Sequence, residues 1–331
     1  MPWQTQANPA EAEFMHNYLD FEKPISDLEG KIRELKKLAT EDESIDTSEE
    51  VERLETRVRE AMADIYSKLN PWQKAQVARH PQRPHFVDYA QTLFTEFTPL
   101  AGDRGFGEDA AIQAGFARFN GQPVALIGQE KGSDTKSRIK HNFGMPKPEG
   151  YRKAIRIMEM AERFRMPVIS LVDTAGAYPG VNAEERGQAE AIARSTEMCL
   201  KLSVPMISVV IGEGGSGGAI AIATGNRVFM LQHAIYSVIS PEGAASILWR
   251  DSTRAKEAAT NMKITADDLK AMGIIDDIIA EPIGGAHRDP KAVMTRAGEV
   301  IAASLKDMSK LSGDALRKAR RQKFLDIGRN L

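Results

Sequence analysis

Hydrophobic positions follow one pattern near the N-terminus of the chain and a different pattern beyond residue 120. Between Phe21 and Leu69 they recur every three or four residues among charged side chains, which is typical of amphipathic helices. The acidic stretch EDESIDTSEE at residues 41–50 separates two such segments, so the sequence predicts a helical hairpin. The apolar stripes consist of Ile25, Leu28, Ile32, Leu35 and Leu38, and of Val51, Leu54, Val58, Met62, Ile65 and Leu69.

Beyond the proline-rich connector ARHPQRPHF at residues 78–86, apolar runs rich in β-branched residues alternate with helical patterns. Strands that are apolar on both faces are typical of parallel sheets covered by helices, so the predicted fold class is α/β. The last two runs lie too close together for an intervening helix, which indicates a break in the alternation. The predicted strands are Val124–Gly128, Val168–Val172, Met206–Ile211, Val228–Leu231 and Ile235–Ile239, and the longest helical stretches are Glu149–Phe164 and Ala183–Leu202.

These patterns divide the chain of 331 residues into three expected regions. Residues 1–86 form the N-terminal helical hairpin and connector, residues 87–290 form the main domain, and residues 291–331 form a C-terminal helical tail. From Asp314 onward the tail is basic, and we expect it to present a solvated face.

Composition narrows the classes of function. The formal net charge of −2 gives no electrostatic footprint for nucleic acid. No stretch is long and apolar enough to span a bilayer, and a secretory leader is not evident, so we expect a cytoplasmic protein. The single cysteine, Cys199, excludes an internal disulfide and a cysteine-built zinc site, and it is expected to be a packed thiol. The histidines have no metal-ligand spacing, so no metal site is expected.

The most informative segment is VPMISVVIGEGGSGGAIAIATGN at residues 204–226, where five glycines fall within Gly212–Gly218. An apolar strand precedes them, and a helical run of small residues follows. Glycine lets bare backbone approach a ligand closely, and the first N–H groups of a helix have no intrahelical acceptor. The segment therefore predicts a main-chain binding site for a group that carries or develops negative charge.

Two motif interpretations of this segment meet obstacles. Gly212, Gly214 and Gly217 fit the dinucleotide-binding pattern, but earlier strands precede it and no acidic residue follows at the required distance. Ser216 fits the centre of a nucleophile elbow. The rest of a serine-hydrolase triad would be Asp251 or Asp276 and then His287, which lies in a turn-rich loop. A phosphate-binding P-loop is excluded because no lysine followed by serine or threonine comes after the glycines.

A third interpretation needs no reactive side chain. Adjacent amides of Gly217 and Gly218 at the helix start form an oxyanion site, and each such donor is worth about 10²–10³ in rate. The alternative is that these glycines only let helix and strand pack closely. A second loop, Asp173–Gln188, also follows a strand and is expected to line the same cavity, with Tyr178 and Pro179 as an apolar wall. Asp173 itself is expected to cap a turn.

The chain resembles the carboxyltransferase alpha subunits of bacterial acetyl-CoA carboxylases from about Tyr18 to Phe324. The resemblance rests on long matches in one order. These are FEKPISDLEGKI at Phe21–Ile32, RHPQRP at Arg79–Pro84, NFGMPKPEGYRKA at Asn142–Ala154, AEERGQAEAIAR at Ala183–Arg194, GEGGSGGA at Gly212–Ala219, SVISPEG at Ser237–Gly243 and EPIGGAHR at Glu281–Arg288.

The resemblance implies a crotonase-like fold of ββα repeats for the main domain. It also implies an α₂β₂ carboxyltransferase that moves a carboxyl group from carboxybiotin on a biotin carboxyl carrier protein to acetyl-CoA. The product is malonyl-CoA for fatty acid biosynthesis, within an ATP-dependent complex that includes biotin carboxylase. The beta subunit of this family supplies most of the acetyl-CoA pocket and a four-cysteine zinc ribbon, which this chain cannot supply.

By the same resemblance, the family's oxyanion pair for biotin falls on Gly217 and Gly218. The surrounding cofactor-binding positions are Gly176, Ala177, Tyr178, Gly215 and Ser216. This sequence departs from the family pattern DTPGAYPG at one position, where Ala175 replaces proline. Two alternatives to the carboxyltransferase remain: a serine hydrolase that uses Ser216, and a non-catalytic scaffold that assembles partners through the hairpin and the tail.

Overall fold

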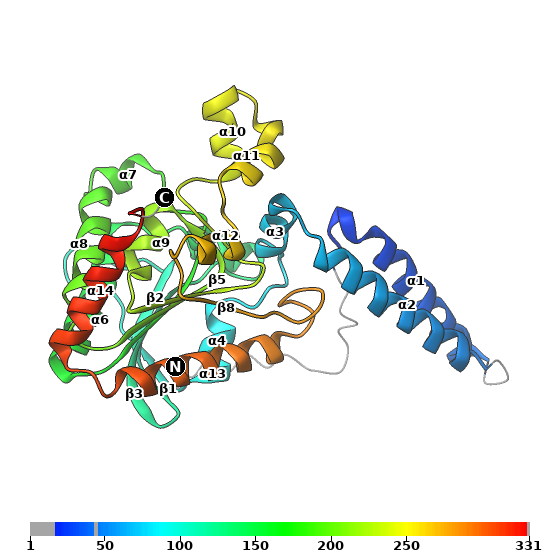
Figure 1. Cartoon of the computed structure of the whole chain (residues 1–331), viewed down its shortest axis with the longest axis horizontal. Helices are drawn as coiled ribbons and strands as arrows, with labels where there is room; N and C mark the ends of the chain where they lie inside the picture. Colours follow the sequence, from blue (N-terminus) through cyan, green and yellow to red (C-terminus); the bar gives the residue numbers. More distant parts are fainter. Residues whose placement is uncertain (1–16, 43–45, 330–331) are drawn as a thin grey trace. The chain divides into compact units, whose positions relative to one another are not determined.

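The computed structural model describes residues 17–42 and 46–329, which divide into a first unit ending at Ile65 and a second unit beginning at Tyr66. In the first unit, a short 3₁₀ turn Asp20–Glu22 leads into α1 (Lys23–Glu41), and α2 (Ser48–Ser67) follows (Figure 1). The predicted helical hairpin is confirmed. Its buried apolar side chains are Ile25, Ile32, Leu54, Val58 and Met62, which belong to the two predicted stripes, and Tyr66 near the end of α2, which does not.

The second unit is built on one sheet with the strand order β1-β2-β3-β4-β5-β6-β8, and β7 pairs with the far end of β5. The first three strands are antiparallel, whereas β3 to β6 and β8 run parallel. The strands are β1 (Thr95–Pro99), β2 (Ile112–Phe119), β3 (Gln122–Gln129), β4 (Val168–Thr174), β5 (Met206–Gly215), β6 (Arg227–Leu231), β7 (Ile235–Ser237) and β8 (Asp277–Ile279).

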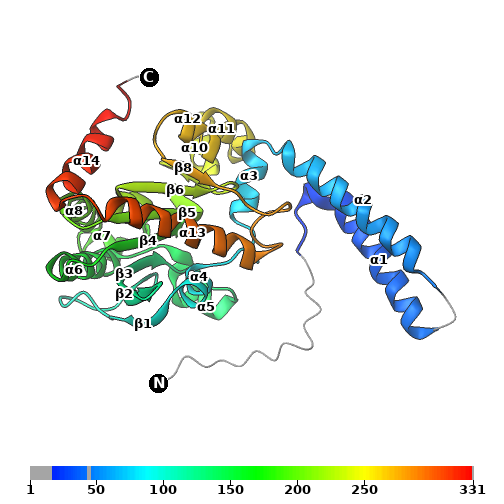
Figure 2. The ribbon, with the colours of Figure 1, turned by 60° about the horizontal axis from the view of Figure 1, so that its bottom comes forward.

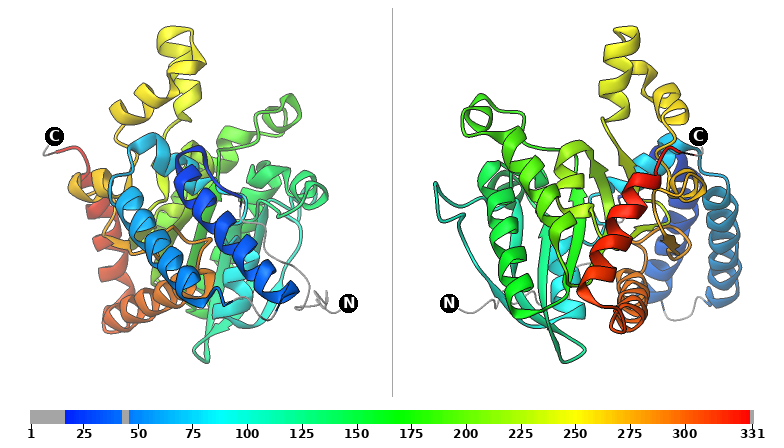
Figure 3. Two further views of the ribbon diagram at one scale, coloured as in Figure 1. Left: turned by 90° about the vertical axis from the view of Figure 1, so that its right-hand side faces the viewer. Right: turned by 60° about the vertical axis from the view of Figure 1, so that its left-hand side comes forward.

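Helices cover this sheet on both faces (Figures 2 and 3). The strand order advances by one from β3 to β6, so right-handed crossovers place α6, α8 and α9 on the same face. On the opposite face, the Phe86 ring of α4 lies against the backbone of Gly128. The helices of this unit are α3 (Pro71–Ala78), α4 (Phe86–Leu93), α5 (Thr135–Lys140), α6 (Pro148–Phe164), α7 (Val181–Glu184), α8 (Gln188–Lys201), α9 (Ser216–Ala223), α10 (Pro241–Trp249), α11 (Ala255–Asn261), α12 (Ala266–Ala271), α13 (Pro290–Met308) and α14 (Gly313–Asp326).

The α/β prediction is confirmed, and all residues of β4 and β5 are buried, as continuous apolar runs require. The patterns missed β1, which is mostly exposed, the eight-residue strand β2, which pairs with β3, and the three-residue strand β8. They also joined α7 and α8 into a single helix. The structure separates these two helices at Gly187, whose φ of 79° is left-handed. The three-region division at residues 86 and 290 stays a prediction. None of the helices within residues 17–42 and 46–329 has the length and hydropathy to cross a membrane.

The C-terminal tail is not simply a solvated face, because α14 packs through Leu316 and Arg320, which are both buried. The Arg320 guanidinium donates to the carbonyl oxygens of Cys199 and Leu202 at 2.7 Å each and to that of Val204 at 2.9 Å. Burial lowers the pKa of Arg320 to about 10, which still leaves it charged at neutral pH. The tail is therefore fastened to the end of α8 and the start of β5. Cys199 is a packed thiol as expected, with a pKa that burial raises to about 12.

Replacing this arginine tests how much the tail contributes to stability. Arg320→Ala leaves three buried carbonyl oxygens without a donor, so we expect a loss of about 3 kcal/mol in the free energy of unfolding. The matched control is Arg317→Ala on the same helix, where an exposed ion pair to Asp314 is worth about 0.5 kcal/mol or less. Urea denaturation of both variants measures the difference, and equal midpoints for the two would contradict the buried role of Arg320.

Candidate functional site

The glycine segment spans the junction between β5 and α9. The strand extends through Gly215, farther than the apolar run indicated, and the helix begins at Ser216. Gly217 and Gly218 therefore lie in the first turn of α9, where amides have no intrahelical acceptor. No side chain caps this helix, and within the described residues neither amide donates to a protein acceptor. The two predicted donors thus keep their hydrogen-bonding capacity.

The second predicted loop lies directly against this helix start. A Cβ atom added at Gly215 would lie 2.2 Å from the Ala175 carbonyl carbon, and one added at Gly218 would lie 2.6 Å from the Gly176 carbonyl carbon. Both contacts are with backbone, which cannot move aside as a side chain can. The structure therefore brings together Gly176, Ala177, Gly215 and Gly218 from the predicted set, and it explains two of the glycines by close packing.

Gly217, Ser216 and Tyr178 have different surroundings. A Cβ at Gly217 would lie 3.3 Å from Ile192 of α8, which is a flexible side chain rather than backbone. Ser216 is exposed and has a φ of 47°, a conformation that costs energy for a residue with a side chain. Tyr178 is half-buried, its amide donates to Pro146, and the Lys147 ammonium lies 4.9 Å from its ring centre.

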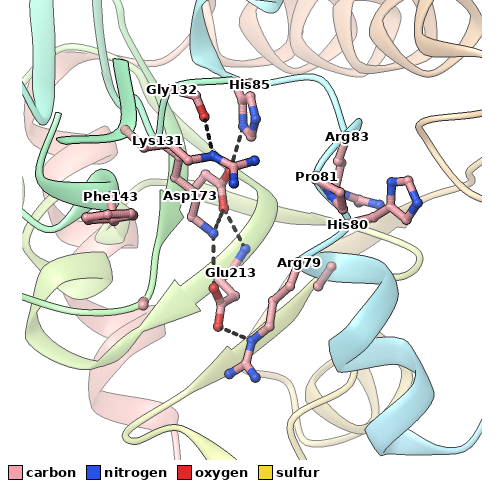
Figure 4. A pocket seen from close by; sticks show the side chains of 13 residues that line it. Arg79, His80, Pro81, Arg83, His85, Lys131, Gly132, Phe143, Asp173 and Glu213 are labelled. Atoms are coloured by element: carbon pink, nitrogen blue, oxygen red, sulfur yellow. Dashed lines mark hydrogen bonds and ion pairs between the residues drawn. The ribbon is translucent and has the colours of Figure 1, made fainter. Parts of the chain in front are cut away.

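A network of ion pairs joins the carboxyl ends of β4 and β5 beneath these loops (Figure 4). Lys131 Nζ lies 2.8 Å from Asp173 Oδ1 and 3.0 Å from Glu213 Oε2. Arg79 Nε lies 2.7 Å from Glu213 Oε1, and its Nη1 lies 2.6 Å from Glu242 Oε1 at the start of α10. The amide of Glu213 also donates to Asp173 Oδ1 at 2.9 Å. The expectation that Asp173 caps a turn is wrong, because its carboxylate is a buried member of this network.

The charges in the network stabilise one another. Burial by itself raises the pKa of Asp173, but the Lys131 ammonium and the nearby His85 outweigh burial and hold the pKa well below its usual range. The pKa of Glu213 is lowered in the same way, because Lys131 and Arg79 outweigh its burial. Both carboxylates are therefore ionised and neutralised by cations, so neither presents an uncompensated negative charge to the neighbouring loops.

The network forms one wall of a cavity of about 460 Å³. The connector segment RHPQRP supplies another wall through Arg79, His80 and Arg83. Arg83 is itself held by a buried double ion pair with Glu281 and by a 2.7 Å hydrogen bond to the carbonyl oxygen of Ile211 in β5. Ala175 of the second loop lines this cavity, whereas none of the predicted site residues, Gly217 and Gly218 included, is among its lining residues.

The serine-hydrolase triad is not assembled. Asp251 caps the turn at Thr253, and Asp276 is paired with Arg227 and Lys323. The imidazole of His287 stacks on that of His80, with ring centres 3.7 Å apart. Each candidate partner of Ser216 is thus engaged elsewhere. Within the described residues, no cluster of three or more histidine, cysteine, aspartate or glutamate side chains could hold a metal ion.

Sequence reasoning missed Lys131 and Glu213, and it misjudged Asp173. One signal could have found them, since each lies at or just beyond the carboxyl end of a predicted parallel strand, where ligand sites of open sheets form. It did not reveal that these three side chains face one another, because residues 40 to 82 apart in the chain meet only in the folded sheet.

Removing the shared cation tests the network. Lys131→Met leaves Asp173 and Glu213 buried without their common partner, so we expect a loss of about 3–5 kcal/mol in the free energy of unfolding at pH 7. The control is the exposed Lys136→Met in the neighbouring helix α5, with an expected change of about 0.5 kcal/mol or less in the free energy of unfolding.

The pH dependence of stability in the wild-type chain and in Lys131→Met gives a second test of the network. Because the folded pKa of Asp173 lies below its ordinary value of 3.8, its stabilisation is fully present above that value and is lost progressively as the pH falls from 3.8 through the folded pKa. The stability difference between the wild-type chain and Lys131→Met should therefore narrow below about pH 4. A difference in the free energy of unfolding that stays constant as the pH falls would contradict the ionised state assigned to Asp173.

Comparisons with known proteins show the family to which this chain belongs. Residues 18–328 match the family described as acetyl co-enzyme A carboxylase carboxyltransferase-like. The acetyl-coenzyme A carboxylase carboxyl transferase subunit alpha of Rhizobium rhizogenes is 81% identical over 317 residues, which cover 96% of this chain and 100% of that protein. The protein of the same name from Agrobacterium fabrum is 79% identical over the same shares of the two chains.

Solved structures agree on the fold. The chain superimposes on transcarboxylase 12S with a TM-score of 0.55 and 22% identity, covering 67% of this chain and 41% of that chain. It superimposes on the beta subunit of Pseudomonas aeruginosa geranyl-CoA carboxylase with a TM-score of 0.53 and 17% identity, covering 75% and 46%. The predicted crotonase-like fold is confirmed. The chain belongs to the family of acetyl-CoA carboxylase carboxyltransferase alpha subunits, and the carboxyltransferase prediction is confirmed over the hydrolase and scaffold alternatives.

Proposed function

We propose that this chain acts with a beta subunit, in an α₂β₂ assembly, to transfer a carboxyl group from carboxybiotin to acetyl-CoA. In this proposal the amides of Gly217 and Gly218 bind the ureido oxygen of biotin, and Gly176, Ala177, Tyr178, Gly215 and Ser216 surround it. Carboxybiotin supplies the transferred carboxyl group, and its ureido oxygen becomes negatively charged when that group is lost. Every contribution of this chain is then one of binding and charge stabilisation.

The observation that carries the proposal is the uncapped first turn of α9. Its two glycine amides have no acceptor within the described residues, and the helix dipole adds partial positive charge at the same end. Such preorganised donors stabilise a developing oxyanion by about 10²–10³ in rate each. The ion-pair network beneath the loops supports the same assignment, because Asp173 and Glu213 are both paired with cations and unpaired carboxylates there would repel the anion.

The absence of side chains at Gly217 and Gly218 suits a bulky planar ligand. Gly218 is already in backbone contact with Gly176, so the loop 175–177 forms one side of the proposed binding position. Tyr178 extends that side with a half-buried ring. The residues present therefore fit a ureido ring approached by main-chain donors, and the proposal requires no general acid or base from this chain.

The proposed partners follow from the family. The relatives are named as subunits, and the chain covers their full length, so a separate beta subunit is proposed to supply most of the acetyl-CoA pocket. The biotin carboxyl carrier protein and biotin carboxylase complete the proposed complex, which we place in the cytoplasm. For the chain itself, we retain residues 1–86, 87–290 and 291–331 as the proposed division into hairpin, carboxyltransferase domain and tail.

Proline at residue 217 tests the main-chain donor directly. Gly217→Pro removes one N–H group, and the fixed φ of proline suits a first helical turn. With the beta subunit present, we expect carboxyl transfer from malonyl-CoA to free biotin to fall about 100-fold in kcat. The matched control, Gly217→Ala, adds a Cβ near the movable Ile192 side chain but keeps the N–H group. Equal activity of the two variants would show that this amide is not a donor in the reaction.

Serine at residue 216 should be dispensable. Ser216→Ala removes the hydroxyl but leaves the amides of α9 in place, so kcat in the same assay should stay within about threefold of the wild-type value. An inactive Ser216→Ala protein with an unchanged melting temperature would favour a nucleophilic serine instead. Hydrolysis of a p-nitrophenyl ester, measured in parallel, checks that alternative directly.

A further inference from the structure

Gln129 links the two loops of the site through a single buried side chain. It is the last residue of β3 and is fully buried. Its Oε1 atom accepts from the amide of Asp173 at 3.1 Å, and its Nε2 atom donates to the carbonyl oxygen of Gly218 at 2.9 Å. One side-chain amide thus bridges the end of β4 and the first turn of α9.

This bridge adds a directional hydrogen bond to a helix start that otherwise packs against the loop 175–177 through bare backbone. The first turn of α9 has no side-chain cap, and its glycines carry no side chains that could lock its orientation by packing. The carbonyl oxygen of Gly218 belongs to the same turn as the amides of Gly217 and Gly218. A hydrogen bond to this carbonyl therefore sets the direction in which the neighbouring amides point.

At the other end of the bridge, Gln129 contacts the amide of Asp173, which is also held in place. The amide of Asp173 is rigid because the Asp173 carboxylate is held by Lys131 and by the amide of Glu213. Movement of α9 relative to β4 would break one of the two Gln129 bonds and leave a buried polar group unsatisfied, at a cost of about 1–3 kcal/mol.

We propose that Gln129 is a positioning residue for carboxyl transfer: it holds the first turn of α9 at the spacing from β4 that aims the amides of Gly217 and Gly218. This role rests on the proposed function of those amides. Gln129 itself touches no substrate in the proposal, and it acts only through the backbone that it orients.

The test uses Gln129→Met in the complex with the beta subunit. Methionine has nearly the same length and volume but makes neither hydrogen bond. For carboxyl transfer from malonyl-CoA to free biotin, we expect kcat to fall about tenfold or more while the KM for malonyl-CoA stays within twofold. This split is expected because a misaligned donor weakens transition-state stabilisation without altering the thioester's own binding pocket.

Ser170→Ala is the matched control. Ser170 is also fully buried, and its hydroxyl donates to the carbonyl oxygen of Ile222 at 2.6 Å, near the opposite end of α9. Loss of this buried hydrogen bond should destabilise the fold as the loss of a Gln129 bond does, but it leaves the first turn of α9 unchanged. We expect kcat within twofold of the wild-type value. A Ser170→Ala variant as impaired as Gln129→Met at an equal loss of melting temperature would overturn the positioning role in favour of a merely structural one.

A second variant, Gln129→Glu, covers the case in which Gln129→Met does not fold. The introduced carboxyl keeps an acceptor for the Asp173 amide, and when protonated it also keeps a donor for Gly218. The charged groups nearby on this strand end and on the adjoining strands include Glu130, Lys131, Asp173 and Glu213. We expect kcat relative to wild type to rise as the pH is lowered from 9 to 6, because protonation restores the donor. A flat ratio would overturn the proposal.

Comparison with the Gly217 variants separates this inference from the proposed function. If Gly217→Pro is inactive while Gln129→Met retains full kcat, the amide site stands and the positioning role of Gln129 is wrong. If Gly217→Pro and Gln129→Met both retain full activity, the amide assignment fails, and the inference fails with it. Loss of kcat in both variants, with Gly217→Ala and Ser170→Ala active, supports the two together.

Discussion

The contact between two stretches of bare backbone is the constraint on which the rest of the site depends. The loop that follows β4 and the junction of β5 with α9 approach so closely that Gly215 and Gly218 have no room for a Cβ atom. This contact brings Gly176 and Ala177 beside the first turn of α9. It also leaves the helix start without side chains, which is the condition for main-chain amides to serve as binding groups.

A helix start made of glycine has no side chains whose packing could fix its orientation, so neighbouring residues must hold it in place. Buried polar side chains at the carboxyl ends of three adjacent strands provide this support. Gln129 ends β3, Asp173 lies near the end of β4 and Glu213 lies near the end of β5, and Lys131 joins the two carboxylates. Arg79 also pairs with Glu213, so each of these two carboxylates has a cationic partner and presents no uncompensated charge to a site proposed for an anion.

The connector before α4 is part of the same construction. Arg79 forms ion pairs with Glu213 of β5 and Glu242 of α10. Arg83 forms an ion pair with Glu281 and donates to the backbone of β5. At the far end of the same strand, Arg320 of α14 binds the backbone carbonyls that lead into β5. Polar side chains from segments distant in sequence therefore secure both ends of the central strand.

Sequence alone determined the hairpin, the α/β class, the buried central strands and the position of the glycine junction, because each of these leaves a local signature. Periodic apolar residues mark helices, continuous β-branched runs mark buried strands, and clustered glycines mark a turn. Weak or short signals failed: β1 is mostly exposed, β2 contains a single β-branched residue, β8 has three residues, and Gly187 divides a helix that looked continuous.

Only the tertiary structure decided which side chains support the glycine helix. Gln129, Lys131 and Asp173 carry no motif, and each has an ordinary local interpretation as a strand end, a loop charge or a turn cap. Their roles arise from pairing between strands that lie 40 or more residues apart along the chain, which brings their carboxyl ends to one edge. Short-range patterns report what a segment can form, whereas the partners of a buried polar group depend on which segments the sheet makes neighbours.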